Sequence, residues 1–138
     1  IEGVGASPLI NAEFLTAVLK EYSPPLRYCF DTAHTHLAAI QNGFDLYAFE
    51  AELLPYLSSV HLWNTRSKDD YLAFRHIPVH PSQSAEKGWV DIARALQVMG
   101  PASNSLPIIF ESDRLYPEAL GNYNYGEGVQ WVKKLLET

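Results

Sequence analysis

Short apolar runs alternate with segments of helical periodicity along this chain, and this alternation constrains the fold more than any other feature. The apolar runs predict strands at 27–31, 58–63, 75–80 and 106–111. The helical spacing of apolar residues predicts helices near 11–22, 46–54, 89–99 and 126–136. Strand–helix alternation is typical of right-handed βα units around a parallel sheet. We therefore expect an α/β fold whose parallel strands follow one another in order, with helices on one outer face.

Composition limits the kinds of protein that this chain can be. Its 138 residues suit one domain over 1–138. The net charge is -6 and the basic residues are scattered, so a nucleic-acid partner is not expected. The single cysteine, Cys29, excludes an internal disulfide framework. No apolar stretch approaches the roughly eighteen residues of a membrane span, and we expect a cytoplasmic protein.

Groups that can bind a metal or move a proton stand at or near the ends of the predicted strands. They are Glu2, Asp31, His34, His61, His76 and Glu111. Because the carboxyl ends of parallel strands share one edge, these side chains are expected to converge. Mixed carboxylate and imidazole ligands suit Mn, Co, Zn, Fe or Mg. The pattern predicts a metal site at this edge.

Each of these residues also has a purely structural explanation. Asp31 could cap the turn after its strand, and His34 could be a solvated loop residue. His61 could be a hydrogen-bonded core histidine, and Glu111 could pair with Arg114. Independent explanations at successive strand ends are less probable than one shared site. The joint pattern therefore favours convergence.

Several short segments resemble motifs of the xylose isomerase-like TIM barrel superfamily, in the same order and at similar spacing. This superfamily includes sugar isomerases and epimerases and the AP endonucleases of the endonuclease IV type (AP endonuclease family 2). The similar segments are IEGVGASPL at the start, FDTAHTH, HLWN, the pair Arg75-His76, and IIFES. The resemblance implies the C-terminal half of a (β/α)8 TIM barrel, with roughly its last four to five βα units.

The isomerase and epimerase branch holds one divalent ion, which the resemblance implies to be Mn, Co, Zn or Mg. The implied metal ligands are Glu2, Asp31, His61 and Glu111. The implied activity isomerises or epimerises a sugar or sugar phosphate by proton transfer next to a carbonyl. Glu2 and Glu111 would act as acid and base, and His34 would contact a substrate oxygen. Arg75 and His76 would bind a hydroxyl or phosphate further out.

Two other functions stay open. An endonuclease IV-like phosphodiesterase would use the same ligands around several zinc ions, but Phe74 stands where that motif has an aspartate ligand. A degenerate barrel without catalysis could bind a sugar or a protein through stacking surfaces. Those surfaces would be Trp63, Tyr71, Trp89 and Tyr123.

The number of predicted strands has its own consequence. Four or five strands of a barrel leave two open edges, whereas a complete eight-stranded barrel has none. The chain also begins at Ile1 rather than at a methionine. We therefore expect an incomplete barrel that needs its N-terminal half or an oligomeric partner.

Overall fold

Three parallel strands form the sheet of this protein in a computed structural model that describes residues 11–138. They are β1 (Tyr28–Asp31), β2 (Leu57–Leu62) and β3 (Ile108–Phe110), in the order β1-β2-β3. Asp31 lies opposite His61, and His61 lies opposite Ile109. The expected α/β character, with parallel strands in sequential order, is confirmed.

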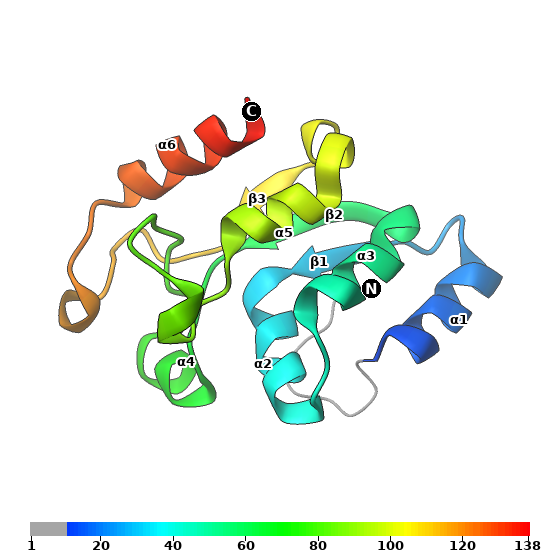
Figure 1. Ribbon diagram of the computed structural model, residues 1–138, viewed down its shortest axis with the longest axis horizontal. Coiled ribbons are helices and arrows are strands. Elements are labelled where there is room, and N and C mark those ends of the chain that lie inside the picture. Colours follow the sequence, from blue (N-terminus) through cyan, green and yellow to red (C-terminus); the bar gives the residue numbers. More distant parts are fainter. Residues whose placement is uncertain (1–10) are drawn as a thin grey trace.

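Helices fill the connections between the strands. The described residues form the α-helices α1 (Ala12–Tyr22), α2 (Thr32–Asn42), α3 (Leu46–Leu53), α4 (Lys68–Phe74), α5 (Ile92–Met99) and α6 (Tyr125–Leu136). Short 3₁₀ turns lie at η1 (Leu54–Tyr56), η2 (Ala85–Lys87), η3 (Gly100–Asn104) and η4 (Glu118–Leu120). Figure 1 shows α3 and α5 over the sheet, with α1 and α6 toward its two sides. No helix within residues 11–138 is both long enough and apolar enough to cross a membrane.

Polar side chains set where the helices begin. Each α-helix starts after a residue whose side chain accepts a hydrogen bond from a backbone N–H of the first turn, which satisfies one donor that the helix itself cannot. These caps are Asn11, Asp31, Asp45, Ser67, Asp91 and Asn124. The predicted start of α1 at Asn11 is confirmed.

The two faces of the sheet differ in what they carry, because successive strand residues point to opposite sides. Phe30, Val60 and Leu62 are fully buried in the core that the helices share. That core includes Leu19 of α1, Phe49 of α3, Ile92 of α5 and Val132 of α6. The alternate positions, among them Asp31 and His61, lie on the opposite face. The predicted site residues and the core residues therefore lie on different faces of the same strands.

The strand predicted at 75–80 is not formed. Arg75 ends α4 with φ of 59°, and only Ile77 makes an isolated antiparallel bridge, to Asn64. Pro78 has no N–H to donate to a sheet. The Gln83 side chain instead binds the backbone there, donating to Pro78 O at 2.9 Å and accepting from His80 N at 3.0 Å. A side chain thus takes the place of a neighbouring strand.

The described residues therefore hold three strands rather than the four to five βα units expected of a half barrel. Helices α2 and α4 stand where no helix was predicted. Asp31 caps α2 directly after β1, while Ser67 and the i,i+4 ion pair of Arg66 with Asp70 begin α4. Capping by Asp31 and Ser67 therefore starts both helices at segments where the spacing of apolar residues did not predict one.

Candidate metal centre

Three ligand groups from three successive strands come together at one edge of the sheet. Asp31 ends β1, His61 lies in β2, and Glu111 directly follows β3. Each offers one ligand atom, and these atoms all lie within 4.8 Å of one another. The structure thus places Asp31, His61 and Glu111 around one point, at the carboxyl end of the strands where α/β proteins bind ligands.

Asp31 is fully buried, and each of its oxygens has an N–H donor. The backbone N–H of His34 donates to Oδ1 at 2.7 Å, which makes Asp31 the N-cap of α2. The indole N–H of Trp63 donates to Oδ2 at 2.8 Å. The proposed structural role of Asp31 as a cap and its place in the cluster are therefore both true.

Two threonine hydroxyl groups form hydrogen bonds with the backbone around Asp31 and Trp63. The Thr32 hydroxyl donates to Trp63 O at 2.6 Å, which joins the first residue of α2 to the residue that follows β2. The Thr35 hydroxyl donates to Asp31 O at 2.6 Å. Both threonines are fully buried. Such bonds fix the backbone from which the ligands project, as a precise site requires.

His61 and Glu111 already interact with each other. His61 Nδ1 lies 2.7 Å from Glu111 Oε2. Two ligands of one ion at metal–ligand distances of about 2.1 Å lie at most about 4.2 Å apart, when they face each other across it. The three ligand atoms, which lie within 4.8 Å of one another, are therefore close to the spacing that one bound ion requires. Two carboxylates and one imidazole also form a donor set that suits Mn²⁺, Co²⁺ or Zn²⁺.

His34 and His76 lie beside this cluster rather than in it. They belong to a group of rings with Trp63 and Tyr71. The His76 ring stacks on Trp63 with centroids 4.2 Å apart, and the His34 ring meets the Trp63 ring edge-on at 4.9 Å. Both imidazoles are 5.6–6.1 Å from the Tyr71 ring. Their predicted roles as substrate contacts stay predictions, as does that of the exposed Arg75.

Sequence reasoning did not identify Trp63 as part of the centre and named it only as a possible stacking surface. The signal was present, because side chains two residues apart on a strand share a face. Trp63 follows His61 by two residues, so the extended chain places the indole on the ligand side. Predicted ligand Glu2 lies outside the described residues.

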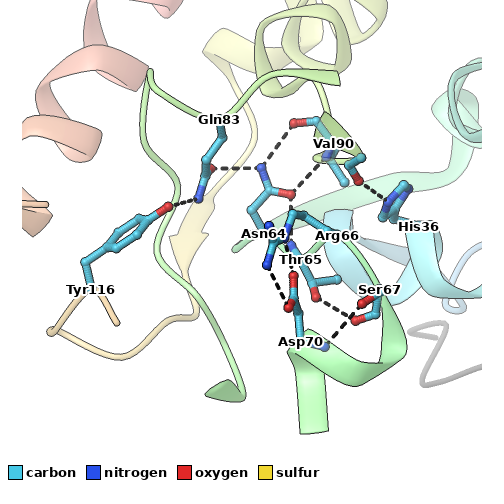
Figure 2. A network of polar contacts seen from close by, with 10 residues as sticks. His36, Asn64, Thr65, Arg66, Ser67, Asp70, Gln83, Val90 and Tyr116 are labelled. Carbon is cyan, nitrogen blue, oxygen red and sulfur yellow. Dashed lines mark hydrogen bonds and ion pairs between the residues drawn. The ribbon is translucent and has the colours of Figure 1, made fainter. Parts of the chain in front are cut away.

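A second network holds the loop that follows α4. Asn64 is its hub: the side-chain amide donates to Gln83 Oε1 at 2.9 Å and to Val90 O at 3.1 Å, and its oxygen accepts from Val90 N at 3.0 Å. Gln83 donates onward to the Tyr116 hydroxyl at 3.0 Å. Figure 2 shows these side chains converging from the end of β2, the loop and the segment after β3. The network is fully buried at Asn64 and fixes the loop without a strand.

His36 belongs to that network and not to the metal centre. His36 Nε2 donates to Gly88 O at 2.9 Å (Figure 2). Burial lowers the pKa of the His36 imidazole. A neutral imidazole with its proton on Nε2 fits this contact. The His36 ring is therefore engaged by the backbone at Gly88 and is not one of the three grouped ligands.

A groove of about 580 Å³ lies elsewhere on the molecule. Residues of α5, η3 and the end of α6 line it, among them Leu96, Pro101 and Leu135. These are the carboxyl ends of the helices, which in βα units lie by the amino ends of the strands. The groove is therefore at the opposite edge of the sheet and shares no residue with the ligand cluster.

Comparison with known proteins adds no relative to these observations. No family model, no curated protein and no solved structure matches the chain. Functional inference therefore depends on the geometry of the centre and on the short sequence resemblance.

Proposed function

We propose that this protein is a metal-dependent isomerase or epimerase acting on a sugar or sugar phosphate. The observation that carries the proposal is the convergence of Asp31, His61 and Glu111 from three successive parallel strands. The resemblance to xylose isomerase-like barrels supplies the reaction class. Within the proposal, the three strands belong to the C-terminal part of such a barrel, and Glu2 is the fourth ligand.

One divalent ion at these ligands would polarise a carbonyl oxygen and so favour proton loss from the adjacent carbon. A carboxylate within reach of that carbon removes the proton, and a carboxylate on the other side returns one. Glu111 and Glu2 fill these two positions in the proposal. His34 contacts a substrate oxygen, while Arg75 and His76 bind a hydroxyl or phosphate further out.

The endonuclease alternative receives no support from the surroundings of Phe74. This ring packs against the small apolar cluster of Ile77, Trp89 and Tyr116. An apolar side chain cannot ligate an ion, and an apolar neighbourhood makes an extra dication costly. The net charge of -6 also disfavours approach to a phosphate backbone.

Metal binding by the full chain tests the ligand assignment. Calorimetric titration with Mn²⁺, Co²⁺ and Zn²⁺ is expected to give one tight site. His61→Ala should weaken binding by at least about 10-fold, because it removes a ligand from the centre. His36→Ala is the matched control and should leave the affinity unchanged, since His36 contacts Gly88 instead. Equal effects of the two substitutions would contradict the assignment.

Proton exchange tests the reaction. The metal-loaded protein is incubated in D₂O with a panel of aldoses, ketoses and their phosphates, and NMR follows deuterium entering next to the carbonyl. Glu111→Gln should abolish exchange, whereas Glu127→Gln, which changes an exposed carboxylate bonded to His80, should not. Incision of an abasic DNA duplex without sugar exchange would replace this proposal with the endonuclease alternative.

A further inference from the structure

We infer that Trp63 is a positioning residue of the centre, whose indole N–H holds Asp31 in the orientation that binds the ion. This inference rests on the proposed function, because it concerns how one of the proposed ligands is held. Trp63 is fully buried, and its Nε1–H donates to Asp31 Oδ2 at 2.8 Å. No part of the indole is available to stack on a substrate.

Two donors on two oxygens fix the plane of the Asp31 carboxylate. The backbone N–H of His34 holds Oδ1 at 2.7 Å from the side of α2, and Trp63 holds Oδ2 from the end of β2. Hydrogen bonds to a charged acceptor are shorter and stronger than neutral ones. The orientation of the carboxylate, and with it that of its remaining lone pairs, is then fixed. Outer groups of this kind tune the affinity of a metal site.

The indole itself has little freedom to turn. The Thr32 hydroxyl donates to Trp63 O at 2.6 Å and lies 3.4 Å from Trp63 N, so the backbone of Trp63 is bonded to the first residue of α2. The ring stacks on His76 at 4.2 Å and meets the edge of His34 at 4.9 Å. The direction of the indole donor is therefore set before any ion arrives. Preorganisation of this kind lowers the cost of binding.

Two substitutions separate the donor from the bulk of the ring. Trp63→Phe keeps an aromatic ring in the same cluster but removes the N–H. Trp89→Phe is the matched control, because Trp89 is also buried but packs with Ile77 and Tyr116. Both variants lose one buried indole, and only one of them loses a donor to Asp31.

Calorimetric titration of the full chain with Zn²⁺ measures the effect. Trp63→Phe is expected to weaken Zn²⁺ binding about 10- to 100-fold, while Trp89→Phe keeps the affinity of the unchanged protein. In the unchanged protein, the indole ¹H–¹⁵N resonance of Trp63 is expected to shift in step with Zn²⁺ occupancy. This resonance tests the positioning role in the unchanged protein, even if the Trp63→Phe variant does not fold.

The outcomes separate this inference from the function on which it rests. If the unchanged protein binds Zn²⁺ and Trp63→Phe binds it equally well, the positioning role is wrong and the metal centre stands. If the chemical shift of the Trp63 indole resonance does not change when Zn²⁺ binds, the positioning role is likewise wrong. If the unchanged protein binds no divalent ion, the metal centre itself is wrong, and the role of Trp63 falls with it.

Discussion

Asp31 serves two purposes with one carboxylate. It caps α2 through Oδ1, and it belongs to the ligand cluster while accepting from Trp63 through Oδ2. A fully buried carboxylate is costly unless its oxygens are hydrogen-bonded, and here both are. A candidate ligand therefore also starts a helix, so a substitution that removes the whole side chain affects both roles at once.

Asparagine separates these roles at position 31. Asp31→Asn keeps one oxygen to cap α2 but loses the negative charge, so metal binding should be lost. Its amide NH₂ then meets the Trp63 N–H, so this variant should lose that hydrogen bond while it keeps the cap. Asp31→Ala removes the cap at a cost of about 1 kcal/mol and leaves the buried Trp63 N–H without its acceptor, at a further ~1–3 kcal/mol. Urea unfolding and Zn²⁺ calorimetry measure the two effects. Equal destabilisation by both substitutions would show that the charge, rather than the cap, stabilises this corner.

At the scale of elements, α3 carries an unusual buried group. Glu50 lies on the same side of the helix as Leu46, Phe49 and Leu53 and is 2 % exposed. Among the described residues, neither carboxyl oxygen of Glu50 has a hydrogen-bond partner. Burial raises the pKa of this carboxyl to about 9, so it is held protonated near neutral pH.

The raised pKa of Glu50 gives stability a pH dependence of known sign. Its ordinary pKa is 4.5, so between that value and about 9 the folded protein holds a proton that the unfolded chain releases. The free energy of unfolding should therefore fall as pH rises, by up to ~1.4 kcal/mol per pH unit from this group. Glu50→Gln should remove that slope. Glu52→Gln, on an exposed position of the same helix, should keep it. Urea unfolding from about pH 5 to about pH 8 measures the slopes, and parallel curves for all three proteins would exclude the effect.

Helix α6 approaches the loop after α4 without room for a side chain. A Cβ placed on Gly128 would lie 1.9 Å from the carbonyl oxygen of Val79. Backbone cannot yield as a flexible side chain does. The glycine therefore sets how closely α6 packs on this loop.

Alanine at position 128 should destabilise the protein, although alanine normally favours a helix. Gly128→Ala is expected to cost about 1–3 kcal/mol or more through overpacking. Gly126→Ala is the control, because its nearest neighbour, Asn124 Oδ1, lies 3.1 Å away on a cap side chain. Thermal unfolding distinguishes the two. A gain of stability at position 128, as expected from helix propensity alone, would mean that α6 does not pack this closely.

Elements that carry an apolar run or a sustained helical spacing of apolar residues could be predicted from the sequence. Elements that depend on side-chain contacts with distant segments could not. Three strands and helices α1, α3, α5 and α6 follow from spacing alone. The segment 75–80 has the residue alternation of a strand, but its backbone bonds to the Gln83 side chain and not to a neighbouring strand. No local sequence pattern reveals this contact. At the site, strand ends predicted the convergence of Asp31, His61 and Glu111. The ring cluster around Trp63 depends on contacts between segments distant in sequence and could not be predicted.

At the scale of the whole molecule, the centre links segments that are far apart in the chain. Its candidate ligands come from the ends of β1 and β3 and from within β2, so an ion bound there would hold the three strands together. The unfolded chain has no such arrangement of ligands. Binding free energy should therefore appear as stability.

Divalent ions should raise the unfolding temperature of this protein. At a free concentration about 100-fold above Kd, one site adds about 2.7 kcal/mol to the free energy of unfolding. EDTA should reverse the gain, and Asp31→Asn should not show it. Differential scanning calorimetry at several Zn²⁺ concentrations measures the shift. An unfolding temperature that is independent of Zn²⁺ would argue against a site built from all three strands.

The two-faced sheet also determines how this protein can change over generations. In β2, Val60 and Leu62 face the shared core, while the residue between them, His61, faces the ligands. Substitutions at Val60 and Leu62 should therefore alter how much folded protein a cell contains, whereas substitutions at His61 should alter the candidate metal centre. New specificities can arise through the ligand face while the buried face keeps the fold intact. A library of variants at positions 60, 61 and 62 should separate into abundance defects at the two outer positions and metal-binding defects at the middle one.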